Sequence, residues 1–303
     1  MGWRKLGLIF NTTGTEPWAR TNAAYPTADL RAPDVLRVYY TSLDARQFGQ
    51  GGYVDLDPSD PRRVLEAPSE PILTLGELGD FDDSGSNPFT VVDFGGCKRM
   101  YYLGWQRTLR APFQTFTGLA FEGPDGRFEK WRRTPVLERT SEEPHIRGAP
   151  WVIRDGDRLL LWYISSSRWS EERDGGLHYH VVIRHAVSED GLDWVVDPHI
   201  CLEPGPGEYA VGRPTVIHEG GRFRMWYSVR SFDRPYAIGY AESGDGVRWT
   251  RIDEAAGIHR SESGWDSEMI CFPCVIRVGE RLLMFYNGNH HGASGFGCAV
   301  WED

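Results

Sequence analysis

The stretch GRPTVIHEGGRFRMWYSVRS, at residues 212–231, predicts a β-hairpin. Its apolar pair Val216 and Ile217 leads through a polar turn with two glycines into a strand in which apolar and polar residues alternate. That alternation is typical of a strand with one buried face. The same order of a proline, a polar turn and a strand that ends in aromatic residues returns in four more stretches, at residues 24–44, 86–106, 148–167 and 271–290.

Two markers recur at one spacing in these five stretches. The first is a proline near the start, at Pro26, Pro88, Pro150, Pro214 and Pro273. The second is a tyrosine near the end, at Tyr40, Tyr102, Tyr163, Tyr227 and Tyr286. Successive copies of each marker lie about 60 residues apart, and a fixed period of this kind indicates a repeat architecture.

The segments between the hairpins indicate which architecture this is. A third strand is expected after each hairpin, and three repeats continue through an Asp-Gly turn into a fourth strand that opens on Trp131, Trp194 or Trp249. Four antiparallel strands per repeat are typical of a propeller blade. The fifth repeat stops at Asp303, after its third strand, whereas residues 2–10 match the fourth-strand pattern. We therefore expect an all-β, five-bladed β-propeller with four antiparallel strands per blade, whose N-terminal strand closes the last blade and removes the exposed edges.

A chain of 303 residues suits one closed all-β body, so a single domain over residues 1–303 is expected. The expected blades cover about residues 22–75, 82–138, 145–203, 208–258, and 266–303 together with 1–10. No helix is expected. The longest loops are expected at residues 104–117 and 165–180, between the second and third strands of the second and third blades.

Charge and composition exclude several partners. The formal net charge of −10 argues against nucleic acid, which needs a basic surface to neutralise its phosphates. No segment is apolar enough to span a membrane and the N-terminus lacks the apolar core of a secretory signal, so we expect a cytoplasmic protein without a membrane partner. The five cysteines are an odd number, which indicates reduced thiols. Cys271 and Cys274 are expected to be buried in an inner strand rather than to bind zinc.

The register of the repeats predicts a site at the mouth of the propeller channel. Positions five to seven residues before each marker proline enter the inner strands at the same place, and four of the five repeats have a carboxylate there. A solvated loop would also collect acidic residues, so each acid taken alone has a structural alternative. The residues at these positions are Arg20, Asp82 and Asp83, Glu143, Glu208 and Tyr209, and Asp266 and Glu268, and Asn22 follows them in the first repeat.

Other residues around these acids suit a carbohydrate ligand. Sugar rings stack on aromatic side chains, and their hydroxyl groups accept and donate hydrogen bonds to charged or amide groups. The candidates in predicted loops or beside the marker prolines are Trp105, Trp169, Trp265, Arg147, Arg213, Asn287, His290 and His291. Packing between blades is the structural alternative for the tryptophans. Neither a metal nor a cofactor is expected.

Taken over its whole length, the chain resembles the five-bladed propeller glycosidases of families 43, 32, 68 and 130. The resemblance rests on the second-strand pattern R-x-x-x-W-Y and on the turns AVSEDGLDW and AESGDGVRW, which are specific for the fold but not for a substrate. It implies carboxylates from different inner strands as base or nucleophile and as acid. In family 43 the base is an Asp directly before an inner-strand proline of the first blade, whereas here Tyr25 precedes Pro26, and the N-D-P signature of family 32 is missing.

Two classes of function follow. The first is a glycosidase or a related glycosyl-transferring enzyme, with Asp83 and Glu268 as the carboxylate pair, Asp266 and Glu208 as further candidate acids, and a small glycoside or oligosaccharide as substrate. The second is a carbohydrate-binding propeller without catalysis, and recruitment of the fold to other small-molecule chemistry in a biosynthetic pathway is a third hypothesis. The four carboxylates favour the first, whereas the missing signatures favour the second.

Overall fold

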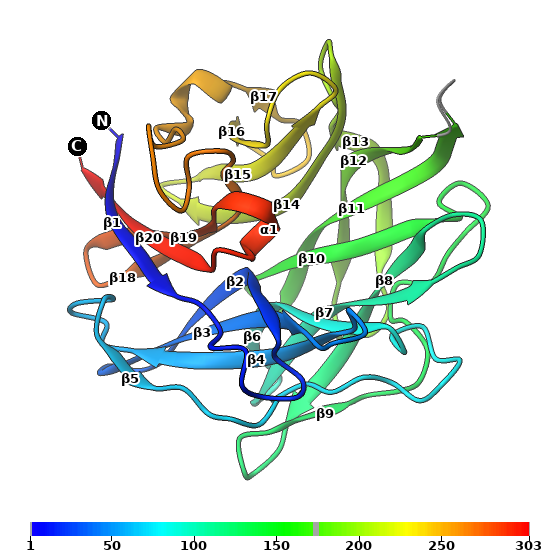
Figure 1. Ribbon diagram of the computed structural model, residues 1–303. Coiled ribbons are helices and arrows are strands. Elements are labelled where there is room, and N and C mark those ends of the chain that lie inside the picture. Colours follow the sequence, from blue (N-terminus) through cyan, green and yellow to red (C-terminus); the bar gives the residue numbers. More distant parts are fainter. Residues whose placement is uncertain (1, 172–175, 303) are drawn as a thin grey trace.

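The computed structural model describes residues 2–171 and 176–302, which form an almost purely β-structure (Figure 1). Besides strands, the described residues contain a short 3₁₀ turn, η1 (Asp253–Ala256), and one helical turn, α1 (Asn289–Gly292). No helix in this part of the chain has both the length and the apolar character required to cross a membrane.

Antiparallel pairing arranges the strands in five groups of four. The first group contains β2 (Thr21–Ala32), β3 (Val35–Leu43), β4 (Gly49–Leu56) and β5 (Val64–Glu66). The second contains β6 (Gly85–Phe94), β7 (Cys97–Arg107), β8 (Phe113–Glu122) and β9 (Phe128–Lys130). The third contains β10 (Ile146–Asp155), β11 (Arg158–Glu171), β12 (Leu177–Ser188) and β13 (Val195–Leu202).

The last two groups complete the chain. The fourth contains β14 (Glu208–Glu219), β15 (Arg222–Ser231), β16 (Ala237–Ser243) and β17 (Thr250–Arg251). The fifth contains β18 (Cys271–Val278), β19 (Arg281–Asn287), β20 (Phe296–Glu302) and β1 (Gly2–Phe10). The prediction that the N-terminal strand supplies the missing fourth strand is confirmed, because β1 pairs with β20 from Gly2 opposite Glu302 to Phe10 opposite Phe296. Figure 1 accordingly shows both ends of the chain side by side.

The groups are joined to one another more weakly than the strands within them. One or two parallel residue pairs connect β4 to β6, β8 to β10 and β12 to β14, so the first four groups form one continuous sheet. The fifth group is a separate four-stranded sheet, and no strand ladder among the described residues joins it to its neighbours. The strand pairing thus shows an all-β fold of four-stranded units, and closure into a five-bladed ring stays a prediction.

Side-chain hydrogen bonds nevertheless connect the fifth group to the first and to the fourth. The Asn287 side chain accepts a bond from the Tyr25 amide at 2.8 Å, and the Cys274 thiol accepts one from the Ala28 amide at 3.2 Å. On the other side, the Phe272 amide donates to Ser228 Oγ at 2.8 Å. As expected, Cys274 is a buried free thiol, and so is Cys271.

The expectation of long loops at residues 104–117 and 165–180 is wrong. Backbone pairing continues through most of both segments, with Arg107 opposite Phe113 and Glu171 opposite Leu177. Polar residues dominate these sequences, but backbone pairing in an antiparallel hairpin does not depend on side-chain polarity. Trp105 and Trp169 therefore lie on strands rather than in loops. Residues 172–175, which belong to the second segment, lie outside the described residues.

Candidate functional site

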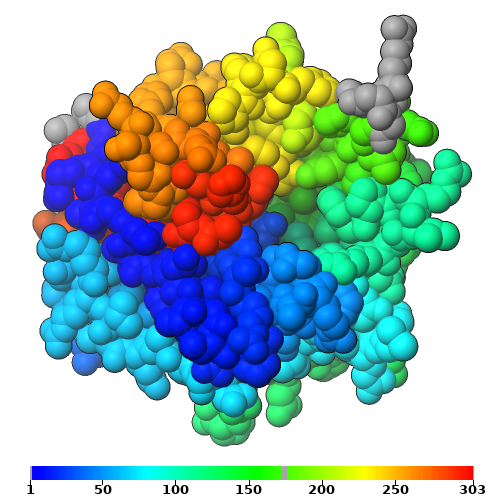
Figure 2. All heavy atoms as spheres, in the orientation of Figure 1, coloured from blue at the N-terminus to red at the C-terminus, as the bar shows by residue number. Residues whose placement is uncertain are grey.

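A central cavity of about 520 Å³ opens where the first strands of the groups meet. In Figure 2 the face that carries α1 is hollowed beside that segment. Residues from all five groups line the cavity, and most of them are aromatic, amide or arginine side chains. They include Asn22, Tyr25, Asn87, Phe89, Trp105, Arg107, Ala149, Tyr179, Arg213, Arg230, Tyr236, Phe272 and His291.

The residues directly before the five marker prolines all line this cavity, and we call them the pre-proline ring. The ring consists of Tyr25, Asn87, Ala149, Arg213 and Phe272. Each of the five inner strands loses its regular register within two residues of this position. Proline cannot donate a hydrogen bond to the sheet, and a β-bulge at such a point bends the strand and re-aims a side chain.

Backbone dihedral angles show how four of these side chains are aimed. The φ angles are 56° for Tyr25, 49° for Ala149, 52° for Arg213 and 54° for Phe272. Residues other than glycine rarely adopt this left-handed conformation, and where they do it concentrates at functional sites. Asn87 differs: the irregularity in its strand falls one residue later, between Pro88 and Thr90, and it brings Phe89 to the cavity as well.

Arg213 is the most deeply buried cation of the cavity, with 3% of its surface exposed. Its Nη2 atom donates to the Pro26 carbonyl at 2.9 Å and to Thr27 Oγ1 at 2.8 Å. Its Nε and Nη1 atoms are buried and have no hydrogen-bond partner among the described residues, and the thiol of Cys274, whose pKa is raised by burial, is a polar but uncharged neighbour of the guanidinium. Burial lowers the pKa of Arg213 to about 10, so the guanidinium is still charged at neutral pH.

A second arginine, Arg230, reaches the cavity from β15. It donates to the hydroxyl of Tyr179, and its guanidinium carbon lies 5.0 Å from the ring centre of Tyr236. The ring of His291 meets that of Tyr236 edge-on at 4.8 Å. Its imidazole pKa is lowered by burial first and by Arg230 second, so His291 is neutral around pH 7.

Trp105 forms part of the cavity wall and is packed tightly on the backbone of β6. A Cβ atom at Gly85 would lie 1.5 Å from the indole nitrogen, so only glycine leaves room for the ring. The exposed Arg107 guanidinium lies 5.5 Å from the same indole ring centre, at the edge of the cavity.

None of the described residues that line the cavity is Asp or Glu. Most of the acids predicted from the register lie instead in what we call the carboxylate clusters. In each cluster an acid accepts a hydrogen bond from the marker tyrosine and pairs with a lysine or arginine, and in all but the fourth group this acid is buried. The clusters are Asp82 with Tyr102 and Lys130, Glu143 with Tyr163, Arg147 and Arg184, Asp253 with Tyr227, Arg251 and Glu208, and Asp266 with Tyr286 and Lys5.

The distances within the carboxylate clusters are short. Lys130 Nζ lies 2.6 Å from Asp82 Oδ2, and Lys5 Nζ lies 2.6 Å from Asp266 Oδ2. Against the opposing effect of burial, hydrogen bonds from Lys5, Ser261 and Tyr286 lower the pKa of Asp266. The first group has an aromatic pair instead of an acid, because Trp18 stacks on Tyr40 with 6.3 Å between ring centres. Each cluster connects the start of an inner strand, or the segment before it, to other strands of its group: to the outer strand through Lys130, Arg251 and Lys5, and to the third strand β12 through Arg184.

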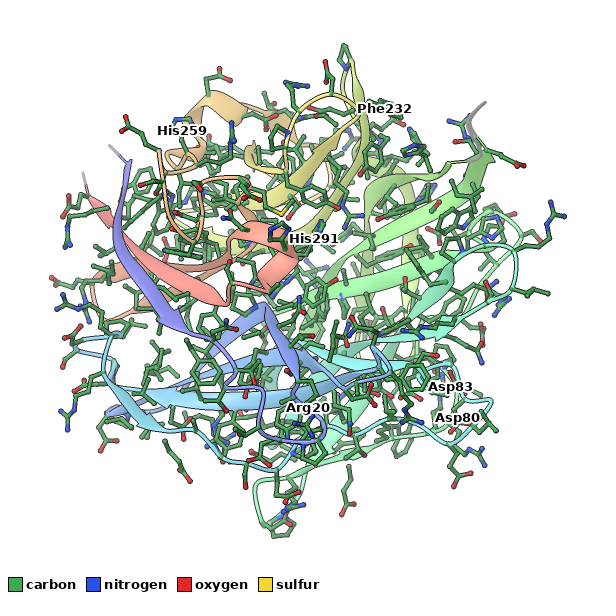
Figure 3. The ribbon with its side chains drawn as sticks, viewed as in Figure 1. Arg20, Asp80, Asp83, Phe232, His259 and His291 are labelled. Atoms are coloured by element: carbon green, nitrogen blue, oxygen red, sulfur yellow. The ribbon has the colours of Figure 1, made fainter. Side chains whose placement is uncertain are left out.

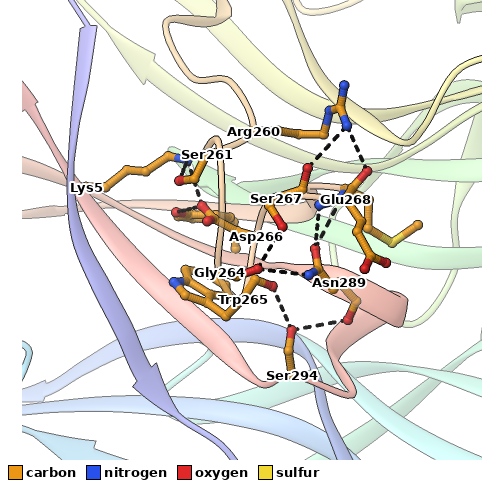
Figure 4. A network of polar contacts seen from close by, with 12 residues as sticks. Lys5, Arg260, Ser261, Gly264, Trp265, Asp266, Ser267, Glu268, Asn289 and Ser294 are labelled. Carbon is orange, nitrogen blue, oxygen red and sulfur yellow. Dashed lines mark hydrogen bonds and ion pairs between the residues drawn. The ribbon is translucent and has the colours of Figure 1, made fainter.

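Asp83 and Glu268 have different surroundings. Asp83 accepts hydrogen bonds from the Gly79 amide and from Ser84 Oγ, both at 2.9 Å, and Figure 3 shows it beside Asp80, away from His291. The Glu268 side chain is 63% exposed and lies 3.3 Å from His290 Nε2. Figure 4 shows the Asp266 side chain turned toward Lys5. The backbone amide of Glu268, two residues later, donates a hydrogen bond to Asn289 Oδ1 instead. Neither acid of the predicted catalytic pair lines the cavity, and their role stays a prediction.

Some of the predicted binding residues line the cavity and others do not. Those that line the cavity are Asn22, Trp105, Arg213 and His291. Trp169 and Tyr209 stand next to it, since their rings contact Tyr179 at 5.0 Å and 6.2 Å between centres. Asn287 is buried and bonds to the carbonyl groups of Ala23 and Gly295.

The remaining predicted binding residues have local roles. Exposed Arg20 bonds to the Gly14 carbonyl, Arg147 pairs with Glu143, and Trp265 packs on Tyr286 at 5.1 Å. Of the two adjacent histidines, His290 faces solvent with 74% of its side chain exposed.

The sequence reading missed Tyr25, Asn87 and Phe272 as site residues. Their signal was present, since each directly precedes a marker proline. Tyr179, Arg230 and Tyr236 carry no comparable signal, because they come from second and third strands and from a loop between them.

Comparison with known proteins places the fold and the family. No family model matches the chain. Solved structures similar to it include a glycosyl hydrolase from Bacteroides ovatus, with a TM-score of 0.76 at 14% identity, covering 99% of this chain and 94% of that one. A structure from work on the GH130 family of mannoside phosphorylases has a TM-score of 0.74 at 15% identity, covering 99% and 94%.

A thermostable family-43 glycoside hydrolase has a TM-score of 0.68 at 17% identity, covering 95% of this chain and 93% of that one. At these identities the likeness concerns the fold, and it confirms the resemblance to propeller glycosidases that the sequence indicated. Two Mycobacterium tuberculosis proteins, uncharacterized protein MT1551 of strain CDC 1551 / Oshkosh and uncharacterized protein Rv1502 of strain ATCC 25618 / H37Rv, are much more similar. Each is 35% identical over 304 residues, covering 100% of both chains, and this chain therefore belongs to the same family as MT1551 and Rv1502.

Proposed function

We propose that this protein is a closed five-bladed propeller whose central cavity binds a small carbohydrate. Ring closure is supported by the side-chain hydrogen bonds that join the fifth group to the first through Asn287 and to the fourth through Ser228. In such a ring the inner strands converge on one channel, and residues of all five groups do line the cavity.

The observation that carries the binding proposal is the composition of the cavity wall. The rings of Tyr25, Phe89 and Phe272 form a continuous apolar surface, with 5.2 Å between the centres of Tyr25 and Phe89 and 4.4 Å between those of Tyr25 and Phe272. Sugars present apolar ring faces to such surfaces. Asn22, Asn87 and two arginines supply polar groups, and the volume of about 520 Å³ lies in the range of small-molecule sites.

A panel of neutral and charged mono- and disaccharides, titrated into the protein by isothermal calorimetry, tests this proposal. The matched variants are Tyr236→Ala, which removes a half-buried ring from the cavity, and Tyr53→Ala, which removes a half-buried ring outside it. We expect Tyr236→Ala to weaken binding about tenfold and Tyr53→Ala to leave it unchanged. The proposal is wrong if no sugar binds at millimolar concentration or if both variants bind as the wild type does.

A second candidate function is cleavage or transfer of a glycosidic bond by Asp83 and Glu268. The observation in its favour is that, among the described residues, Asp82, Glu143, Glu208 and Asp266 are paired with lysine or arginine, whereas Asp83 and Glu268 are not. Two carboxyl groups without a lysine or arginine partner are available for general acid and base chemistry. The solved glycoside hydrolases of the same fold support this candidate, although fold alone does not fix function.

A screen of aryl glycosides and sugar-phosphate donors tests the second candidate, with the wild type beside Asp83→Asn and Glu268→Gln. Loss of a general acid or base lowers turnover by about 10²-fold or more, whereas the melting temperature is expected to stay nearly the same because neither side chain is deeply buried. Full activity in both variants on a true substrate would remove this pair from the mechanism.

A further inference from the structure

The central cavity contains positive charge without a described negative partner. Arg107, Arg213 and Arg230 all line it, and none of its described lining residues is acidic. Cations elsewhere in this chain do receive carboxylates, as Lys130 does from Asp82 and Arg251 does from Glu208. In a protein with a formal net charge of −10, acids were abundant enough to neutralise the cavity as well.

Arg213 shows the imbalance most clearly. Its side chain is almost completely buried, yet two of its three nitrogen atoms, Nε and Nη1, have no hydrogen-bond partner among the described residues. A buried charge without a counter-ion lowers the stability of the folded chain. The residue is also held in the left-handed conformation, with φ at 52°, which is unfavourable for a residue with a Cβ atom. A bound anion that accepted hydrogen bonds from the free nitrogen atoms of Arg213 would explain why this unfavourable arrangement is present.

Arg230 lines the same cavity. Its Nε atom is buried and unpartnered among the described residues. Burial raises the pKa of the Tyr25 hydroxyl to about 12, and the charges of both Arg230 and Arg213 work in the opposite direction on that one group. Arg213 and Arg230 line the same cavity as Tyr25.

We propose that the ligand of the central cavity is an anionic sugar derivative whose carboxylate or phosphate ester is bound by Arg213 and Arg230. This inference rests on the proposed carbohydrate-binding function and adds the charge of the substrate to it. Guanidinium groups bind planar and tetrahedral oxyanions with charge-assisted hydrogen bonds, and Nε and Nη1 of Arg213 are two buried donor atoms without a hydrogen-bond partner among the described residues. The ring of Phe89, 4.6 Å from the Arg213 guanidinium, lies beside this position as a surface for the sugar ring.

Isothermal calorimetry on the full chain with matched probes tests the proposal. The probes are the methyl glycosides of glucose, galactose and mannose, the corresponding uronic acid glycosides, the corresponding hexose phosphates, and inorganic phosphate alone. We expect at least one charged sugar to bind about tenfold more tightly than its neutral parent, with an affinity that falls as salt is added. Preference for uronic acids identifies a carboxylate ligand, and preference for hexose phosphates identifies a phosphate ester.

Variants of single arginines connect the preference for a charged sugar to the residues that bind it. Arg230→Gln and Arg213→Gln are expected to remove the preference for the charged sugar. Arg222→Gln is the control, because Arg222 lies at the opposite, exposed end of the same strand β15. Arg213 also bonds to Pro26 and Thr27, so where Arg213→Gln does not fold, Arg230→Gln and the charge-conserving Arg213→Lys carry the test.

The outcomes separate this inference from the function on which it rests. Equal affinity for neutral and charged sugars, unchanged in Arg230→Gln, overturns the anionic ligand and leaves the carbohydrate site standing. Tight binding of inorganic phosphate with no gain from any attached sugar overturns the carbohydrate function and, with it, the anionic sugar. Failure of every probe to bind overturns both.

Discussion

Two sets of equivalent positions recur around this molecule, and they differ in how their chemistry varies. The pre-proline ring has a different residue in every group, and all five line the cavity: Tyr25, Asn87, Ala149, Arg213 and Phe272. The carboxylate clusters keep one chemistry in four groups, an acid with a tyrosine and a cation, and none of their acids lines the cavity.

This difference separates structural from functional positions in a repeat protein. A position that fastens strands of the same group meets the same surroundings in each repeat, so the same residues recur there. A position at the cavity faces one shared ligand from five directions, so each repeat contributes another group. The recurrence of Asp82, Glu143 and Asp266 before inner strands is thus explained by the repeat itself.

The largest expected effect comes from breaking a carboxylate cluster. Asp82→Ala leaves the partly buried Lys130 without its partner, and we expect it to lower the free energy of unfolding by about 3–5 kcal/mol. Its neighbour Asp83 pairs with no cation among the described residues, so Asp83→Ala is expected to cost less than about 1 kcal/mol. Equilibrium denaturation measures both values. Similar losses in the two variants would mean that the clusters are not what stabilises the groups.

A pH series distinguishes the clusters from other buried groups. His185 is 4% exposed, neither of its ring nitrogens has a partner among the described residues, and burial lowers its pKa to about 4. Between this pKa and the ordinary histidine value of about 6.5, the unfolded chain binds a proton at His185 that the folded chain does not bind. The free energy of unfolding is therefore highest above about pH 6.5 and falls by roughly 3 kcal/mol as the pH drops to about 4.

Asp266 responds in the same direction, with stability lost as the pH falls, but in a more acidic window. Its lowered pKa adds stability above the value of an unfolded Asp, about 3.9, and this contribution is lost only at more acidic pH. His185→Gln tests which group titrates between pH 7 and about 4. Denaturation in this range should show a weaker dependence of the free energy of unfolding on pH in the variant than in the wild type. An unchanged slope in that variant would show that His185 is not the titrating group.

The cavity side of the comparison is tested by two tryptophans. Trp105 lines the cavity, whereas Trp265 packs on Tyr286 and does not line it. We expect Trp105→Ala to weaken sugar binding about tenfold, the scale of losing one stacking ring, and Trp265→Ala to leave the affinity of the folded protein unchanged. Titration calorimetry compares the two, with circular dichroism as the check of folding. Equal losses would contradict the assignment of the cavity as the binding site.

The smallest expected effect concerns backbone conformation in the pre-proline ring. Ala149 and Ala210 are both buried alanines of inner strands, but only Ala149 has a left-handed φ, 49°. Glycine adopts that conformation freely, so Ala149→Gly is expected to destabilise the protein less than Ala210→Gly by about 1 kcal/mol. Thermal unfolding of the pair measures the difference. A larger loss for Ala149→Gly would mean that its conformation is not strained.

Much of the fold could be read from the sequence because its signals are local. Alternation of apolar and polar residues marks each strand, the turns mark where hairpins reverse, and Trp3 identified β1 as the outer strand that pairs with β20. The marker tyrosines recur at a fixed spacing in the sequence, and the structure shows that four of them hydrogen-bond to the cluster acids. The repeated sequence thus determined the repeated structure, including the equivalence of Asp82, Glu143 and Asp266.

The direction of the side chains was decided only by the tertiary structure. Counting along an ideal strand assumes that successive side chains alternate between faces, but the bulges beside the prolines break that alternation where the cavity begins. Arg230, Tyr179 and Tyr236 reach the cavity from different strands and a loop, so no spacing in the sequence brings them together. The repeat period is a property of the chain, whereas the chemistry of the cavity depends on how five groups meet.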